Sequence, residues 1–136
     1  FGLVDDKTAR QKSAEGTQRL AVKMRDDEQA IRELSGGNQQ KVVIGKWLLT
    51  NPKVLLLDEP TRGVDVGARF EIYSITMNLA KRGSAVLFIS SEIPELMGVC
   101  DRILVMSEGR ITGNVPKPEF HQEKFLELAL PGQTLK

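Results

Sequence analysis

The sequence is short of several features that would place a protein in a class at once. Its one cysteine, Cys100, cannot form an internal disulfide, which favours a reducing compartment. No apolar run reaches the roughly 18 residues that a membrane-spanning helix needs. The net charge is only +1, so the chain lacks both the basic surface expected of a nucleic-acid-binding protein and an acidic tail. We therefore expect no membrane-spanning segment and no nucleic-acid partner.

The N-terminal end lacks the features of a secretory signal peptide. Residues 1–10 have neither a basic start nor an apolar stretch. The first residue is Phe1 rather than methionine, which leads us to expect that the chain begins inside a longer protein. Hydrophobic residues make up 40% of the 136 residues. That share is enough for a core, and the length suits a single modest domain.

The distribution of apolar residues predicts alternating helices and strands. Polar residues of mixed charge predict a helix, a turn and a short helix at the periphery of the fold, within residues 5–32. Further helices are predicted by apolar spacing at residues 35–50, 67–81 and 119–130. Apolar runs predict strands at residues 54–57, 85–89, 102–106 and 111–115. This order predicts an α/β fold with a largely parallel sheet flanked by helices.

Uninterrupted apolar runs are typical of strands that are buried on both faces of a parallel sheet. Residues 54–57 and 85–89 have this pattern. We therefore expect both runs to be covered on both faces. We also expect the large aromatic side chains of Trp47 and Phe70 to lie in the core.

Two carboxylates follow the first of these apolar runs. Asp58 and Glu59 stand at the carboxyl end of the predicted strand, where open α/β sheets bind ligands. Asp58 is suited to hold a hydrated Mg²⁺, which prefers carboxylate oxygen and keeps several waters. Glu59 can polarise an attacking water as a general base. The pair indicates a site of nucleotide hydrolysis, although a surface turn after a strand explains this short motif equally well.

A second motif opens the helix that precedes this strand, and it reads Leu34-Ser35-Gly36-Gly37-Asn38-Gln39-Gln40-Lys41. The two glycines leave backbone N–H groups uncovered at the start of a helix. Those donors and the positive end of the helix dipole suit a phosphate. The Ser35 hydroxyl adds another donor and also makes this residue a good N-cap. Taken alone, the Ser-Gly-Gly start favours an ordinary capped helix.

Together the two motifs resemble the signature motif and the Walker B strand of ATP-binding-cassette (ABC) ATPases. The signature lies one helix upstream of Walker B, as in that family, and Gly63-Val64-Asp65 stands in the place of its D-loop. The resemblance covers nearly the whole chain and implies a partial ABC-type P-loop NTPase fold. It assigns residues 1–33 to the helical subdomain, 34–115 to the C-terminal portion of the nucleotide-binding domain and 116–136 to a C-terminal extension.

Longer stretches of sequence narrow this resemblance. They resemble the second cassette of bacterial monosaccharide-importer ATPases of the galactose/methyl-galactoside, ribose or xylose type. The stretches are residues 38–41, 45–50, 58–68, 90–96 and 101–106. That family carries two cassettes in one polypeptide, and the chain resembles the last part of the second. The resemblance implies an ATPase that energises uptake of a monosaccharide from the cytoplasmic face of the bacterial inner membrane.

The same resemblance implies cofactors, partners and residue roles. The cofactors are ATP and Mg²⁺, and the partners are the first cassette, the membrane permease subunits and, indirectly, a periplasmic sugar-binding protein. Ser35, Gly36, Gly37 and Asn38 would contact nucleotide as signature residues, completing the site whose P-loop belongs to the first cassette, and Asp65 would contact nucleotide as a D-loop residue. In the other site, Asp58 would hold the metal, Glu59 would be catalytic, and Ser91 would contact nucleotide.

The sequence departs from the general family pattern in three places. Residues 1–136 contain no glycine-rich P-loop with Lys-Ser or Lys-Thr, so we expect the isolated chain to be inactive as an ATPase. Ser91 stands where most cassettes have a switch histidine, which predicts slow hydrolysis at this site. Asn38 replaces the commoner glutamine of the signature but keeps its amide. Two alternatives stay open: a soluble ABC ATPase not coupled to transport, and a non-catalytic module that completes a partner cassette's ATP site.

Overall fold

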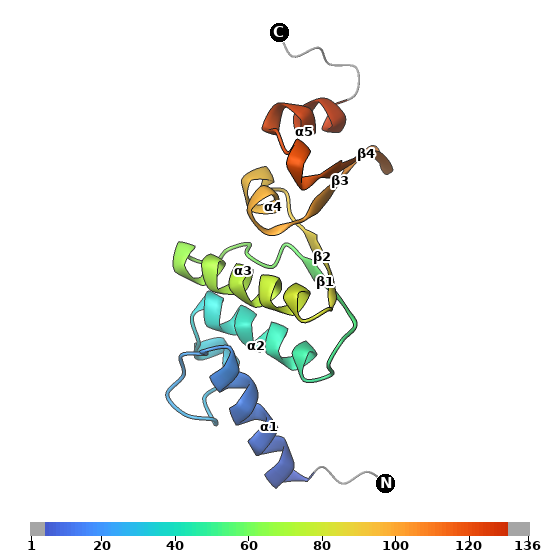
Figure 1. The fold of residues 1–136 in the computed structure, drawn as a ribbon. Coiled ribbons are helices and arrows are strands. Elements are labelled where there is room, and N and C mark those ends of the chain that lie inside the picture. The colour runs from blue at the N-terminus through green and yellow to red at the C-terminus, as the bar shows by residue number, and fades with distance from the viewer. Residues whose placement is uncertain (1–4, 131–136) are drawn as a thin grey trace. The chain divides into compact units, whose positions relative to one another are not determined.

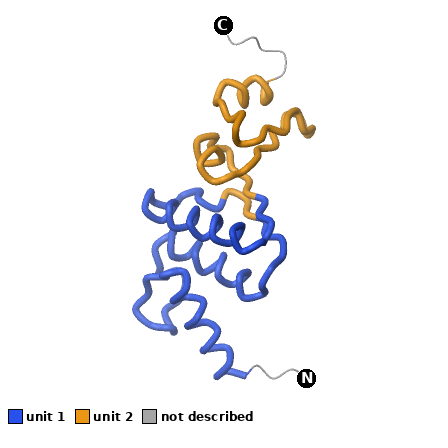
Figure 2. The backbone as a smooth tube through the Cα atoms, viewed as in Figure 1, with its two compact units in different colours: residues 1–56, 60–87 blue, residues 57–59, 88–136 orange. Residues whose placement is uncertain are grey.

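The computed structural model describes residues 5–130. Residues 1–4 of the expected helical subdomain and 131–136 of the expected extension lie outside the described residues. The chain divides into two compact units, shown in Figure 2. Unit 1 comprises residues 1–56 and 60–87, and unit 2 comprises residues 57–59 and 88–136. The division passes through the β1 and β2 strands, so each unit holds part of both.

Helices make up most of unit 1. They are α1 (Asp6–Arg19), α2 (Gly36–Leu48) and α3 (Val66–Lys81), which Figure 1 labels, and the short 3₁₀ helix η1 (Ile31–Glu33). Helix α2 contacts both α1 and α3. The buried apolar side chains of this unit include Leu20, Ile44, Leu48, Ile72 and Leu79. Helix α2 is therefore the central element on which α1 and α3 pack.

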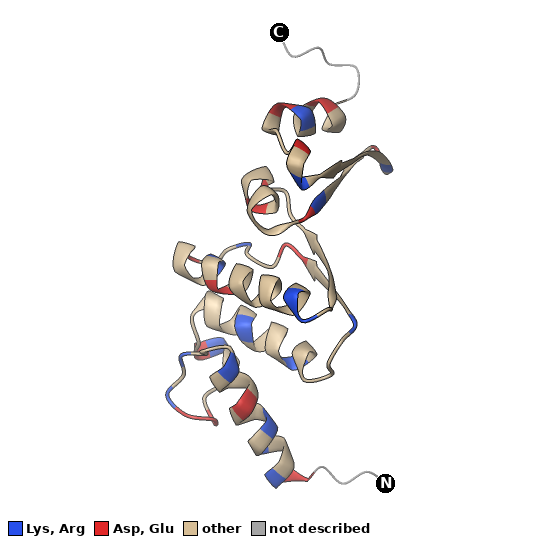
Figure 3. Ribbon diagram, viewed as in Figure 1, with Lys and Arg blue, Asp and Glu red and all other residues tan. Residues whose placement is uncertain are grey.

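Helix α1 is peripheral, as its composition predicted. None of its residues is buried, and the ribbon of Figure 3 is coloured for residues of both charge signs along it. Asp5 caps the N-terminus of α1, where its carboxylate accepts hydrogen bonds from the N–H groups of Lys7 and Thr8. The Thr8 hydroxyl also donates to this carboxylate, and together these donors hold the pKa of Asp5 below its usual value. The helix start is thus fixed by its own sequence rather than by packing.

Strands β1 (Val54–Asp58) and β2 (Ala85–Ile89) are neighbours in a sheet. Ala85 N donates to Lys53 O at 2.9 Å, and Glu59 N donates to Ile89 O at 2.9 Å. The bonded positions advance together along both strands, so the pairing is parallel. Gly83, which follows α3, has a φ of +94°, the left-handed conformation expected of a glycine after a helix end. The helix between two parallel strands confirms the α/β fold.

Unit 2 is built around an antiparallel hairpin. Strands β3 (Arg102–Ser107) and β4 (Arg110–Pro116) pair through the turn at Glu108 and Gly109, whose φ angles are +49° and +75°. Helices α4 (Ile93–Val99) and α5 (Gln122–Ala129) and the 3₁₀ helix η2 (Lys117–Glu119) complete the unit. Its core side chains are Ile103, Val105, Val115 and Phe125. Both φ angles are positive, as a tight turn between two strands requires.

The prediction that both faces of the first two strands are buried is wrong for this chain. Burial alternates along β1, where Leu55 and Leu57 are buried while Val54 and Leu56 are 60% and 66% exposed. In β2, Phe88 is buried while Leu87 and Ile89 are about half exposed. Successive side chains of a strand point to opposite faces. The described residues therefore cover one face of this strand pair and leave the other apolar.

The aromatic side chains expected in the core also lie at the surface. Trp47 is 55% exposed and lies beside the Lys46 ammonium, which is 5.6 Å from its ring centroid. Phe70 is 64% exposed and makes an edge-to-face contact with Tyr73. The spacing of apolar residues predicted that Trp47 and Phe70 belong to helices. It did not predict which face of each helix packs against another element.

Candidate nucleotide-binding site

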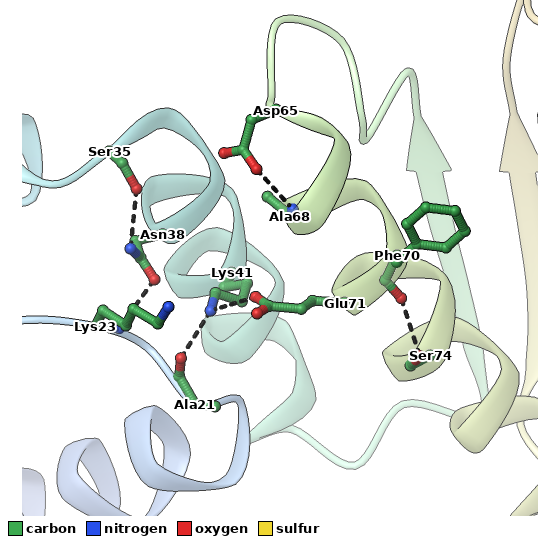
Figure 4. A network of polar contacts seen from close by, with 10 residues as sticks. All are labelled: Ala21, Lys23, Ser35, Asn38, Lys41, Asp65, Ala68, Phe70, Glu71 and Ser74. Atoms are coloured by element: carbon green, nitrogen blue, oxygen red, sulfur yellow. Dashed lines mark hydrogen bonds and ion pairs between the residues drawn. The ribbon is translucent and has the colours of Figure 1, made fainter.

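The first group of candidate site residues lies at the start of α2 in unit 1. Ser35 occupies the N-cap position, but its hydroxyl makes no capping bond to the helix. It instead accepts a hydrogen bond from the Asn38 amide nitrogen at 2.9 Å, and the Asn38 amide oxygen accepts from the Lys23 N–H at 2.9 Å, as Figure 4 shows. Asn38 thus ties the chain that follows α1 to the start of α2. Because the Ser35 hydroxyl does not accept a hydrogen bond from the N–H groups of the first turn, those groups can donate to another acceptor.

The two glycines of the motif have different surroundings. Gly36 is exposed, and a Cβ built on it would meet only the Gly63 carbonyl oxygen, at an ordinary 3.5 Å. Gly37 is buried, and a Cβ there would lie 2.3 Å from the Cβ of Ala68 in α3. Gly37 is therefore required for the close approach of α2 and α3. Gly36 leaves an open backbone at the helix start, the arrangement that suits a phosphate.

This difference predicts unequal costs for the same substitution at neighbouring positions. We expect Gly37→Ala to destabilise the packing of α2 on α3 by about 1–3 kcal/mol, because one backbone must move away from the other. Gly36→Ala, the matched control, should cost less than about 1 kcal/mol. Amide hydrogen exchange in α2 measures both. Adding Ala68→Gly should restore slow exchange in the Gly37→Ala variant, and failure to do so would contradict this account.

Asp65 is also placed by unit 1, at the start of α3. It occupies the N-cap position, and its carboxylate accepts the Ala68 N–H at 3.0 Å (Figure 4). Its Oδ2 lies 3.7 Å from the position of a Cβ on Gly37. The carboxylate of the expected D-loop residue therefore lies close to Gly37 of the signature motif, a closeness that the sequence did not predict.

A buried lysine joins the three parts of unit 1. Lys41 is 1% exposed, and its ammonium donates to the Glu71 carboxylate at 2.7 Å and to the Ala21 carbonyl at 2.7 Å. Figure 4 shows this ammonium between α2, α3 and the end of α1. Ala21 has a φ of +48°, which is uncommon for a residue with a side chain. The two hydrogen bonds of Lys41 therefore connect the strained turn at Ala21 to α2 and α3.

The second group of candidate site residues belongs to unit 2. Asp58 ends β1 and is exposed, while Glu59 follows it with a φ of +46°. Two bonds hold Glu59: its N–H donates to Ile89 O, and its Oε1 accepts from the Ser91 N–H, both at 2.9 Å. Left-handed backbone at a residue other than glycine is costly and gathers at functional sites. Ser91 thus contacts Glu59 through its backbone rather than through its side chain.

The residues present suit the group that the resemblance implies. Mg²⁺ in nucleotide sites is bound by one or two carboxylates, by phosphate oxygens and by water, so the single exposed carboxylate of Asp58 fits it. Within residues 5–130 there is no cluster of three or more histidine, cysteine, aspartate or glutamate side chains that would hold a metal by itself. The exposed backbone at Gly36 fits a phosphate group. The donor set is that of a metal–nucleotide complex rather than of a metal bound by the chain alone.

Each expected site residue lies in one of two groups. Unit 1 brings together Ser35, Gly36, Gly37, Asn38 and Asp65, and unit 2 brings together Asp58, Glu59 and Ser91. The sequence did not single out Ser90 and Glu95, which adjoin Ser91 in unit 2. The sequence does contain a pattern that could have predicted their contact. A glutamate four residues after a Ser-Ser pair can reach back across the first turn of a helix to a serine. The assigned roles stay predictions for every residue of the two groups.

The sequence of this chain is similar to those of known proteins. The ABC transporter family model matches residues 4–62. The ribose import ATP-binding protein of Lactococcus lactis subsp. lactis is 55% identical over 97% of the chain, and the arabinose import ATP-binding protein of Vibrio parahaemolyticus is 50% identical over 96%. The galactose/methyl galactoside import ATP-binding protein of Vibrio vulnificus is 52% identical over 95%. The chain spans only 27%, 26% and 26% of the lengths of these three relatives.

Solved structures agree with the sequence comparison. An ATP-binding cassette of an ABC transporter, MJ1267, superposes with a TM-score of 0.78 at 26% identity, over 96% of this chain and 53% of that one. A nucleotide-free ABC transporter cassette gives 0.78 at 27% identity, over 93% and 51%. These matches confirm the expected ABC-type P-loop NTPase fold and the resemblance to sugar-import ATPases. With identities of 50–55% across almost its whole length, the chain is similar to the ATP-binding proteins of sugar importers, and its residues 4–62 match the ABC transporter family model.

Proposed function

We propose that the chain is the C-terminal part of the second cassette of a two-cassette ATPase that energises monosaccharide import. The observation that carries this proposal is the high identity to sugar-import ATP-binding proteins over nearly the whole chain, combined with a coverage of about a quarter of their length. Helices within residues 5–130 are too short or too polar to cross a membrane. We infer that permease subunits form the membrane passage and that the chain acts at the cytoplasmic face.

The two groups of site residues have separate tasks in this proposal. The start of α2 contacts the phosphates of an ATP whose P-loop lies in the first cassette, through the exposed backbone at Gly36. Asp58 holds Mg²⁺ in the other site, where the ion neutralises charge on the phosphates. Glu59 accepts a proton from the attacking water, because its carboxylate is fixed at the end of β1.

Substitution of Glu59 by glutamine tests the catalytic part of the proposal. We expect Glu59→Gln to lower the share of ATP hydrolysis that this site contributes in the complete ATP-binding protein about 10-fold or more, because an amide cannot accept the proton. The control is the equivalent substitution in the first cassette. If Ser91 weakens this site, Glu59→Gln costs less than the control; equal losses would show that both sites hydrolyse ATP. A wild-type rate for Glu59→Gln would contradict the assignment of Glu59 as general base.

The alternative of a non-catalytic module has one observation in its favour. The residues 1–136 contain no P-loop, so the chain by itself supplies only the signature half of one site and the carboxylate half of another. Photo-crosslinking with an azido-ATP, with and without the first cassette, separates the two functions. Labelling of this chain only in the presence of the first cassette, together with full activity of Glu59→Gln, would favour the module.

A further inference from the structure

The turn that follows β2 is fixed by a serine and a buried glutamate. The Ser90 hydroxyl donates a hydrogen bond to the Glu95 carboxylate and accepts one from the Glu92 N–H at 3.0 Å. Between these two contacts, the Ser91 N–H donates to Glu59 Oε1 at 2.9 Å. All of these residues belong to unit 2. The direction of the Ser91 N–H is therefore set by the conformation of the turn that Ser90 closes.

Glu95 is placed where a carboxylate is costly without partners. It is 6% exposed, in the first turn of α4. Glutamate is rarely buried unless it is hydrogen-bonded, because burial removes the water that stabilises its charge. A glutamate without a structural role would be expected on the exposed face of α4, in contact with water. Its contact with Ser90 ties the turn at residues 90–92 to the helix that follows.

We propose that Ser90 and Glu95 are a positioning pair for Glu59. They hold the turn so that the Ser91 N–H points at the Glu59 carboxylate, while the bond from Glu59 N to Ile89 O fixes its backbone. Neither residue contacts the reacting atoms, and both act through Glu59. The proposal rests on the proposed function, in which Glu59 is the general base. It also explains how a cassette with serine at position 91 orients that base, since the contact uses the main chain.

The orientation of Glu59 matters because a general base must lie within hydrogen-bonding reach of the water that it deprotonates. A misplacement of about 1 Å can cost on the order of 100-fold in rate. One N–H bond to one carboxylate oxygen leaves the second oxygen for water. Loss of the turn would release the carboxylate while leaving the rest of the nucleotide site in place. The expected signature is therefore a lower kcat with little change in KM for ATP.

The test uses the complete ATP-binding protein and four variants. We expect Ser90→Ala to lower kcat about 3- to 10-fold, with KM for ATP within about 2-fold of wild type. Ser90→Thr keeps the hydroxyl and should return kcat to near the wild-type value. Glu59→Gln is the reference for loss of the base. The double variant Ser90→Ala/Glu59→Gln should be no slower than Glu59→Gln alone, because the pair acts through Glu59.

The outcomes separate this proposal from the proposed function. If Glu59→Gln keeps the wild-type rate, Glu59 is not the base and the proposed function fails. If Glu59→Gln is slow while Ser90→Ala keeps the wild-type kcat, only the positioning pair is overturned. A rise in KM at unchanged kcat, or a further loss in the double variant, would also overturn it, since either would show that Ser90 acts elsewhere. Because Ser90→Ala removes a single oxygen atom, it tests the pair even if truncation of buried Glu95 prevents folding.

Discussion

Replacing Gly36 by aspartate is expected to abolish ATP hydrolysis by the complete ATP-binding protein while leaving α2 folded. Gly36 is exposed, and its added Cβ would make only an ordinary contact with the Gly63 carbonyl. A carboxylate in the first turn interacts favourably with the helix dipole, by about 0.3–1 kcal/mol. The same charge would repel a phosphate at the position where the helix start presents its N–H groups. The variant separates ligand binding from folding, because the added charge stabilises the helix start but opposes the binding of phosphate.

The matched control for this variant is Gly36→Asn, which has nearly the same shape without the charge. We expect the aspartate variant to lose ATP hydrolysis about 100-fold or more, the range seen when a donor to the reacting phosphoryl or acyl group is lost. The asparagine variant should retain more activity, and hydrogen exchange in α2 should be as slow as in wild type for both. Wild-type hydrolysis by Gly36→Asp would remove the start of α2 from the nucleotide site.

The second large effect is expected from truncation of Lys41. Lys41→Ala removes the ammonium that contacts Glu71 and Ala21 O and leaves a cavity where its side chain was buried. Loss of one partner of a buried ion pair costs about 3–5 kcal/mol. Glu71 is 46% exposed, so water can replace the lysine on that side, and we expect about 3 kcal/mol.

Hydrogen exchange of α2 and α3 amides in the complete protein measures this loss, which corresponds to exchange roughly 100-fold faster. Lys41→Met keeps most of the side-chain volume and should lose less, because only the polar contacts are removed. Glu71→Gln keeps an oxygen that can accept from Lys41 and should cost about 1 kcal/mol. Unchanged exchange in Lys41→Ala would show that the three-way contact does not stabilise unit 1.

The order and type of the elements could be predicted from the sequence because they depend on local signals. The polar start of α1, the glycine that follows α3 and the Glu108-Gly109 turn all lie where their residue types require. The two chemical motifs were found for the same reason, since both are continuous in sequence. The closeness of Asp65 to Gly37, with 3.7 Å between its Oδ2 and the Cβ position of Gly37, was not predicted, because it depends on how α2 and α3 pack.

The features that could not be predicted depend on which face of an element is covered. An apolar run shows that a strand can be buried on both faces, but the described residues cover only the side of Leu55 and Leu57. The signature motif indicated a phosphate site at Gly37, whereas the structure adds a packing reason, its approach to Ala68. The sequence marked Lys41 only as the last residue of the signature motif, and its burial could not be predicted because it depends on the meeting of three elements.

Uptake of a radiolabelled monosaccharide into proteoliposomes tests the central claim most directly. The vesicles hold the complete ATP-binding protein, with this chain as its C-terminal part, and its permease, with sugar-binding protein outside and Mg-ATP inside. We predict ATP-dependent accumulation of the sugar by the wild-type complex and loss of both accumulation and hydrolysis in Gly36→Asp. Accumulation by Gly36→Asp at the wild-type rate, in vesicles that contain equal amounts of the protein, would contradict it.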